Sequence, residues 1–276
     1  MKVFVGMPAY NEELIIGPAI KSTYDYVDKI FVVNGSKEGP STDKTVEEAA
    51  SVGSKVEIVS GTFVADDNSW GEQKQRQKCI DLMEKGENNW CIFQDADEVF
   101  DDPQIQRLHE HMAKALSEIK LFAYGVTHFW RDPWHAVGGG DWNKPRRYQA
   151  FRLIPGAQML SYNEIGYECG GVYENWDLSG DPPRHVLDDV FYYHYGHVLT
   201  FERMEFKVKH FVEQGLCVDW GYQSNEWEKF RRERFLPSWN KSLEEVQGCK
   251  PYTGKHPEEV HHILEKLANL WKRYDG

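Results

Sequence analysis

The sequence has no long apolar run, few cysteines and no excess of basic residues, and each shortage excludes a class of protein. No stretch approaches the roughly twenty apolar residues of a membrane span, and residues 1–5 lack the long apolar segment of a secretory signal. The five cysteines form no CxxC pair, which disfavours a zinc site or a disulfide framework. We therefore expect a cytoplasmic protein without a transmembrane segment.

Charge and composition narrow the partners further. The 276 residues include 32 basic and 44 acidic side chains, and the formal charge of −12 disfavours nucleic acid as a partner. Aromatic residues make up 14% of the chain, and such rings are typical both of a core and of sites that stack on sugars or bases. A chain of this length has room for one α/β domain, with or without an appended subdomain.

The first hundred residues alternate between strand and helix patterns. Strands are predicted over 3–7, 29–34, 55–60 and 90–94, with Pro8 ending the first of them. Helices are predicted over 11–26, 41–52 and 72–85, with Asn11 and the polar residues 41–43 as candidate caps. Repeated β-α-β units with short connections predict an α/β fold with a doubly wound, mainly parallel sheet.

The second half has a less regular pattern, which predicts a mixed sheet with helices. A helix is predicted over 105–119, strands over 121–130, 148–154 and 190–194, and a helix from a Thr200 cap through Glu213. A last helix is predicted from Pro257, with an apolar stripe of Val260, Ile263, Leu264, Leu267, Leu270 and Trp271. We expect one continuous domain whose halves are residues 1–100 and 101–276.

Three carboxylates lie within the four residues 95–98, directly after an apolar strand. Folding alone gives no reason to gather like charges there, whereas a hard divalent cation removes their repulsion and can hold a diphosphate. The crevice beyond the carboxyl ends of the strands is also where open α/β sheets bind ligands. We therefore assign Asp95 and Asp97 to a metal–nucleotide site, and Asp101 and Asp102 to the start of a helix.

Two further segments are expected at the same edge of the sheet. Residues 8–12, Pro-Ala-Tyr-Asn-Glu, follow the first strand, and residues 34–45, which begin Asn-Gly-Ser and end Asp-Lys-Thr, follow the second. Each segment alone is ordinary turn chemistry. Together, in this order and spacing with residues 95–98, they indicate a ligand site.

These segments resemble the family 2 glycosyltransferases, inverting enzymes of the GT-A fold. The family pattern has Pro-x-Tyr-Asn-Glu after one strand, Asp-x-Gly-Ser-x-Asp-x-Thr after the next, an Arg-Asn helix, and a strand ending in Asp-Ala-Asp-Glu. The first and last elements match letter for letter, and residues 43–45 match the Asp-x-Thr. Asn34 stands where an acidic residue is usual, and Arg76-Gln77 replaces Arg-Asn, which bears on the selectivity for the sugar nucleotide.

The resemblance implies a donor-binding half at residues 1–100 and an acceptor-binding half at 101–276. It implies that Asp97 ligates Mn²⁺ or Mg²⁺ and that Asp95 lies against the ribose and diphosphate. Asn34 is expected to reach toward the base, and Arg76 is either a diphosphate contact or a helix-surface arginine. The remaining expected donor contacts are Pro8, Ala9, Tyr10, Glu12 and Ala96.

Residues 192–197, Tyr-Tyr-His-Tyr-Gly-His, are similar to the His-Tyr-Gly segment of many relatives. A late histidine often completes the metal shell of GT-A enzymes, so the resemblance implies His194 as a ligand of the metal or a contact of the diphosphate. His197 is a second candidate for the same role. Lys207 and Lys209, on the helix that follows, either face the phosphates or coat the solvent face.

An inverting transfer needs a general base that takes the proton of the acceptor hydroxyl. Relatives carry a Gly-x-Val-His-Glu segment after an Arg-Leu strand, and here residues 171–174, Gly-Val-Tyr-Glu, follow Arg152-Leu153. This similarity implies Glu174 as the base, with Glu164 next and Glu168 as a further candidate.

The sequence therefore predicts a metal-dependent inverting glycosyltransferase. It would move a sugar from a UDP- or GDP-sugar to a free hydroxyl of a glycan, metabolite or lipid acceptor. Trp130, Trp134 and Trp142 are expected either to stack on an acceptor sugar or to belong to the core. The alternatives are a nucleotidyltransferase, which would need a glycine-rich Lys/Arg loop after the first strand, and a non-catalytic sugar- or nucleotide-binding protein on a degenerate transferase fold.

Overall fold

The computed structural model describes residues 1–64, 71–137, 147–158, 172–173, 184–213, 223, 225–246 and 248–271. The chain divides into two units, the first made of residues 1–126, 145–193 and 256–261, and the second of residues 127–144, 194–255 and 262–276. Strands β6 (Leu121–Trp130) and β11 (Arg184–His194) begin in the first unit and end in the second.

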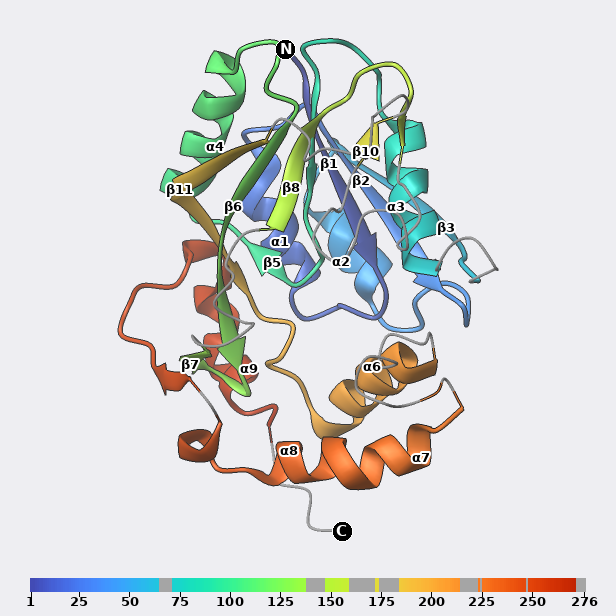
Figure 1. The fold of residues 1–276 in the computed structure, drawn as a ribbon, viewed down its shortest axis with the longest axis vertical. Helices are drawn as coiled ribbons and strands as arrows, with labels where there is room; N and C mark the ends of the chain where they lie inside the picture. The colour runs from blue at the N-terminus through green and yellow to red at the C-terminus, as the bar shows by residue number, and fades with distance from the viewer. Residues whose placement is uncertain are drawn as a thin grey trace. The chain divides into compact units, whose positions relative to one another are not determined.

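Four parallel strands form the centre of the first unit (Figure 1). Their spatial order is β3-β2-β1-β4, with β1 at Val3–Ala9, β2 at Lys29–Ser36, β3 at Val56–Thr62 and β4 at Trp90–Phe93. The helices between them are α1 (Ile16–Tyr24), α2 (Thr45–Ser51) and α3 (Gly71–Leu82). This alternation confirms the predicted α/β fold with a mainly parallel central sheet.

Antiparallel strands extend the sheet beyond β4. Strand β8 (Arg147–Arg152) pairs with β4, and β6 pairs with β8. Strand β11 pairs with β6 and with the short β5 (Glu98–Val99), and helix α4 (Asp102–Lys114) follows β5. Two short strands, β9 (Ala157–Gln158) and β10 (Val172–Tyr173), pair separately. The mixed sheet that the second half of the sequence predicts is therefore present.

Helix α3 packs closely on the sheet. Gly6 in β1 permits this approach, because a Cβ atom there would lie 2.9 Å from the Cβ of Cys79. The apolar core under α3 includes Phe4, Phe31 and Val33 from the strands. Burial raises the pKa of the Cys79 thiol to about 12, so this cysteine is an inert core residue.

The second unit contains the last residues of β6 with β7 (Asp132–Val137) and β12 (Cys249–Pro251), all antiparallel. Helix α6 (Phe201–Glu213) packs against a broken helix that runs through α7 (Trp227–Phe230), a π-helical turn (Arg231–Phe235) and α8 (Leu236–Asn240). Their shared core is aromatic and aliphatic, and its buried members are Phe201, Met204, Val212, Trp227, Phe230, Phe235 and Trp239.

Several element boundaries differ from the prediction. Strand β1 continues through Pro8 to Ala9. Its pairing with β4 ends at Gly6 opposite Phe93, so β1 is unpaired on that side at Pro8, where a missing N–H is tolerated. Helix α1 begins only at Ile16 and has no side-chain cap. Asn11, with a φ of 55°, instead accepts a hydrogen bond from the Thr42 amide.

The predicted last helix is not one α-helix. A 3₁₀-helix spans Glu258–Ile263 and a short helix α9 spans Leu264–Ala268. The buried Val260 and Ile263 are three residues apart, a spacing that suits the 3₁₀ turn better than a continuous α-helix. Two other predicted helix starts are confirmed: Asp101 accepts from the Gln104 amide at 3.0 Å, and Thr200 accepts from the Arg203 amide at 3.3 Å.

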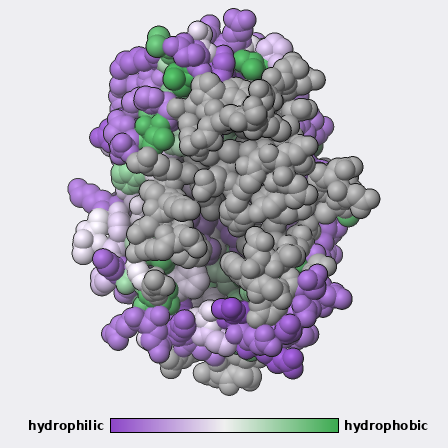
Figure 2. All heavy atoms as spheres, viewed as in Figure 1, coloured by the Kyte–Doolittle hydropathy of each residue, from purple (hydrophilic) through white to green (hydrophobic). Residues whose placement is uncertain are grey.

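Hydrophilic residues dominate the described part of the face shown in Figure 2, with only small apolar areas between them. Within the described ranges, no helix combines the length and the apolar character that crossing a membrane would require.

Candidate functional site

The loops after β1 and β2 are joined by hydrogen bonds at the carboxyl end of the parallel sheet. The Asn11 amide donates to the Ser41 hydroxyl at 2.8 Å, and the Glu12 amide donates to the Thr45 hydroxyl at 2.6 Å. The Asn11 side chain closes the same contact by accepting from the Thr42 amide at 2.8 Å. Two segments whose paired residues lie 30 to 33 positions apart in the sequence therefore form one surface.

Hydrogen bonds of the Asn34 side chain hold this surface to the sheet. Its side chain is buried, and its Oδ1 accepts from the amide and the hydroxyl of Ser41 at 3.3 and 2.5 Å. Its Nδ2 donates to the Ser60 hydroxyl at 3.0 Å, which ties β2 to β3. A carboxylate at this position would have no N–H to donate to Ser60, whereas the amide of Asn34 does. The predicted contact of Asn34 with the base stays a prediction.

Gln75 in α3 is a buried residue that the sequence did not single out. Its Nε2 lies 3.2 Å from the Ala9 carbonyl, 2.6 Å from the Val33 carbonyl and 3.2 Å from the Gly35 carbonyl. One side-chain amide therefore fastens the ends of β1 and β2 to α3. A glutamine in a polar helix segment is typical of a solvent-facing position, so no pattern in the sequence marked it.

The turn that the sequence placed at residues 95–98 follows β4 directly. The Asp95 amide donates to the Glu98 carboxylate, and the Glu98 amide donates to the Asp95 carbonyl, both at 3.0 Å. Glu98 is 1% exposed, and both its carboxylate oxygens accept from Gln149 Nε2 at 3.1 Å. Glu98 thus holds the turn in shape, which leaves Asp95 and Asp97 as the acidic residues for a ligand.

Arg76 reaches this turn from α3. Its guanidinium pairs with Asp95 at 2.5 Å and with Glu72 at 2.8 Å, and it lies 5.3 Å from the centre of the Phe93 ring. Burial lowers the pKa of Arg76, but the carboxylates of Asp95 and Glu72 outweigh this and raise it above its usual value. Its side chain is only 14% exposed, which disfavours the helix-surface alternative.

The other predicted donor residues lie at the same edge of the first unit. Ala9 and Ala96 are buried, while Pro8, Tyr10 and Glu12 are half-buried in and after β1. Asp97, the predicted metal ligand, is 6% exposed. Strand β1 lies between β2 and β4 and pairs with both, so the three segments converge as the sequence predicts. The candidate bases Glu164, Glu168 and Glu174, together with Trp142, lie outside the described residues.

His194 belongs to the second unit, where it meets two other histidines. Its Nδ1 lies 2.8 Å from Nδ1 of His128, and its ring centre lies 5.1 Å from that of His197. His128 and His194 are buried and His197 is half-buried. The sequence did not single out His128, because a histidine within an apolar strand pattern carries no local signal of its partners.

The other predicted residues of the second unit are two lysines and two tryptophans, which differ in their contacts and exposure. Lys207 donates to the Gly196 carbonyl at 3.3 Å, and Lys209 lies 3.7 Å from Glu213 on the same helix. Trp130 is half-buried with its ring 5.3 Å from that of His197, and Trp134 is 42% exposed. Of the two tryptophans, Trp134 has the surface that stacking on a sugar would require.

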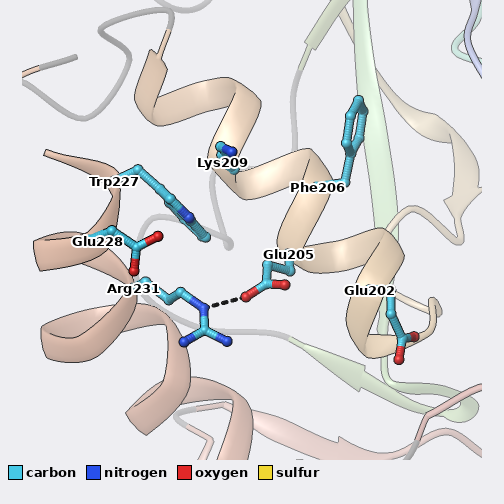
Figure 3. A pocket seen from close by; sticks show the side chains of 7 residues that line it. All are labelled: Glu202, Glu205, Phe206, Lys209, Trp227, Glu228 and Arg231. Carbon is cyan, nitrogen blue, oxygen red and sulfur yellow. Dashed lines mark hydrogen bonds and ion pairs between the residues drawn. The ribbon is translucent and has the colours of Figure 1, made fainter. Parts of the chain in front are cut away.

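A groove of about 510 Å³ runs between α6 and α7 in the second unit. Figure 3 shows charged side chains from both helices around it, including Glu205, which pairs with Arg231 across the groove. Its complete lining is Glu202, Glu205, Phe206, Lys209, Trp227, Glu228 and Arg231.

Open, mainly parallel α/β sheets bind ligands in the crevice beyond the carboxyl ends of their strands, and the acidic turn after β4 lies at that edge. The sequence matches the family model described as glycosyl transferase family 2 over residues 4–164. The chain belongs to this family, and it is a glycosyltransferase of the GT-A fold. This membership favours the glycosyltransferase prediction over the nucleotidyltransferase alternative.

Solved structures to which the chain is similar include TarS 1–349 of S. aureus, at 16% identity and a TM-score of 0.43, with 89% of this chain and 77% of that chain covered. Another is glucosyl-3-phosphoglycerate synthase from Mycobacterium tuberculosis in complex with Mn²⁺, uridine diphosphate and phosphoglyceric acid. It is 22% identical with a TM-score of 0.33, and 48% of this chain and 44% of that chain are covered. No curated protein matches the sequence.

Proposed function

We propose that this glycosyltransferase is a metal-dependent, inverting enzyme that uses a UDP- or GDP-sugar as donor. One observation carries the proposal: the loops after β1 and β2 and the Asp95–Glu98 turn converge at one edge of the parallel sheet. Ligands bind at this edge in open α/β sheets. The donor would lie there, with the acceptor held by residues of 101–276.

The donor set of the turn fits a hard divalent cation. Asp95 and Asp97 offer carboxylate oxygens, the ligands that Mg²⁺ and Mn²⁺ prefer, and Asp97 is largely removed from solvent. Asp97 would hold the metal, and Asp95, oriented by Arg76, would face the ribose and diphosphate. The cation would stabilise the charge of the departing diphosphate. The role of His194 as a further ligand stays a prediction.

Arg76 and the loop after β1 would position the rest of the donor. Tyr10 and Glu12 are half-buried beside the β2 loop, where a base and ribose can lie against them. Arg76 carries a permanent positive charge and is held in place by its ion pair with Asp95. From this position its guanidinium would contact the diphosphate. In the acceptor half, Glu174 would take the proton of the attacking hydroxyl, with Glu164 as the alternative base.

Calorimetry with uridine and guanosine diphosphates, with and without Mn²⁺, tests the proposal. We expect one nucleotide to bind only in the presence of Mn²⁺, since the metal neutralises the diphosphate beside the carboxylates. The matched variants are Asp97→Asn, which should lose this binding, and Asp102→Asn, an exposed helix-start residue, which should keep it. Nucleotide binding that is equally tight without metal would contradict the metal-dependent mechanism.

A further inference from the structure

We propose that Gln94, the last residue before the acidic turn, is a positioning residue that fixes Asp95 and Asp97 in the arrangement that holds the metal and the diphosphate. This inference rests on the proposed function, because it assigns a support to the same carboxylate site, and it concerns the first unit alone. Gln94 follows β4 directly, and its side chain is fully buried. A buried amide has to find its hydrogen-bond partners within the protein.

The side chain of Gln94 bonds to helix α1 and to the far end of the turn. Its Nε2 lies 2.8 Å from the Ala19 carbonyl, 2.8 Å from the Glu98 carbonyl and 3.2 Å from the Ser22 hydroxyl. Its Oε1 accepts from the Thr23 hydroxyl at 3.1 Å. Two of these partners are backbone carbonyls, which can only accept, so the amide nitrogen must face them and the orientation of the side chain is fixed.

Hydrogen bonds of Gln94 fasten both ends of the acidic turn. Its backbone amide donates to the Gly6 carbonyl of β1 at 3.1 Å, which holds the start of the turn, and its side chain holds the Glu98 carbonyl at the end. Between these two points, the Glu98 amide donates to the Asp95 carbonyl at 3.0 Å. The backbone of residues 95–97 is therefore held on both sides, which limits where its two aspartates can place their carboxylates.

Helix α1 gives the turn a second support through Ser22. The Ser22 hydroxyl accepts from the Phe100 amide at 3.2 Å and donates to the Ala19 carbonyl at 2.7 Å. The chain is therefore tied to α1 before the turn through Gln94 and after the turn through Phe100. Because α1 also follows the loop after β1, one helix links the loop proposed to hold the base and ribose to the turn proposed to hold the metal.

Replacement of Gln94 by leucine removes the amide and keeps the approximate size of the side chain. The Glu98 carbonyl then loses its bond from Gln94, and the Thr23 hydroxyl faces an apolar group. Buried polar groups that lose a partner favour a rearrangement in which they find another. We expect the turn to shift, and with it the carboxylates. Outer residues that orient metal ligands typically contribute about tenfold to a hundredfold to metal affinity.

Electron paramagnetic resonance of Mn²⁺, together with whichever of uridine and guanosine diphosphate the wild type binds, tests the role of Gln94. The signal of free Mn²⁺ gives the affinity, and the spectrum of the bound ion reports on the arrangement of its ligands. At a temperature where the variant is fully folded, Gln94→Leu should bind Mn²⁺ about tenfold to a hundredfold more weakly than wild type. The spectrum of the ion that it does bind should also change.

Gln104→Leu is the matched control for Gln94→Leu. Gln104 is also a buried glutamine of the first unit, and its Oε1 accepts from the Phe191 amide at 3.0 Å, which joins α4 to β11. We expect Gln104→Leu to lower the melting temperature, as Gln94→Leu does, but to keep the wild-type Mn²⁺ affinity and spectrum. An equal loss of affinity in both variants would overturn the positioning role, because the loss would then follow from destabilisation alone.

The wild-type affinity and spectrum in Gln94→Leu would also overturn the positioning role and leave Gln94 as a residue that only stabilises the fold. The absence of metal-dependent nucleotide binding by the wild type is a different result, since it contradicts the proposed function itself and the role of Gln94 with it. Where Gln94→Leu does not fold, Thr23→Val decides the question, because it keeps the side-chain shape and removes the hydroxyl that donates to Gln94. Thr23→Val should weaken Mn²⁺ binding, and an unchanged affinity would overturn the inference.

Discussion

At the scale of single residues, the acidic turn after β4 divides its carboxylates between structure and ligand. Glu98 is buried and receives hydrogen bonds from the Asp95 amide and from Gln149. Asp95 is paired with Arg76, and Asp97 is the proposed metal ligand. Acidic side chains that lie within four residues of one another therefore have different tasks.

Substitution of Glu98 should damage the fold more than the chemistry. In Glu98→Gln, one of the two oxygens that accept from Gln149 Nε2 is replaced by an amide nitrogen, so one of these buried contacts becomes a contact between two donors. We expect a loss of about 1–3 kcal/mol in the free energy of unfolding, the usual penalty for an unsatisfied buried group. Urea denaturation measures it. Stability equal to wild type would show that these hydrogen bonds do not hold the turn.

Substitution of the proposed base should separate donor binding from transfer. Glu174→Gln keeps the shape and hydrogen bonding of the side chain but cannot take a proton in the transition state. We expect unchanged donor affinity and a loss of turnover on the order of a hundredfold to ten-thousandfold. Glu164→Gln is the matched comparison. If Glu164→Gln stops transfer and Glu174→Gln does not, the base is Glu164.

Glu259 gives a pH-dependent prediction. Burial first, and then the charges of Asp102, Glu258 and Asp101, raise its pKa above the usual 4.5. Within the part of the chain that the structure describes, its buried Oε2 has no hydrogen-bond partner. The folded state therefore favours the protonated form, and this contribution to stability is fully present below pH 4.5 and is lost as pH rises through the raised pKa.

We therefore expect Glu259→Gln to melt at a higher temperature than wild type near pH 7 and at a similar temperature near pH 4. The amide has no charge to desolvate, so the variant should lack the loss of stability that wild type shows as pH rises. Melting curves across this pH range measure the difference. A gap between the two proteins that does not change with pH would contradict the raised pKa.

At the scale of elements, Gln75 joins α3 to the ends of β1 and β2. Gln75→Leu removes the donor that three buried carbonyls share, while the size of the side chain is kept. We expect a loss of about 1–3 kcal/mol in stability and weaker nucleotide binding, since the loops after both strands lose their anchor. Denaturation and calorimetry on the same preparation measure both effects.

Gln77→Leu is the control for Gln75→Leu. Gln77 lies on the same helix but is bonded to Asp81, in a contact on the exposed side. Equal losses in both variants would show that the effect comes from the helix itself and not from the contact with the strands.

The elements that the sequence predicts best are those with a strong local pattern. The apolar strand at 121–130 matches β6 at both ends, because its pattern alone decides its limits. The start of α1 and the split of the last helix were missed, since tertiary contacts decide them. Asn11 accepts from the distant Thr42 amide, and Val260 and Ile263 pack in a 3₁₀ turn.

At the scale of the whole molecule, the chain is one family member with two structural units. The order of its motifs predicted the parallel sheet and the convergence of Asn11, Asn34 and Asp95, because the topology of a doubly wound sheet decides where the strand ends meet. The contacts of Gln75 and His128 could not be predicted from the sequence. Their roles come from partners that are distant along the chain, 40 to 66 residues away.

The most direct test of the central claim is the hydrolysis of UDP- and GDP-sugars without acceptor, measured with Mn²⁺ and after its removal with a chelator. We predict that wild type and Asp102→Asn release nucleoside diphosphate from one of these donors only when Mn²⁺ is present. Asp97→Asn, with the fold intact by circular dichroism, should release none. Donor hydrolysis by Asp97→Asn at the wild-type rate, or an equal rate after chelation, would contradict the account.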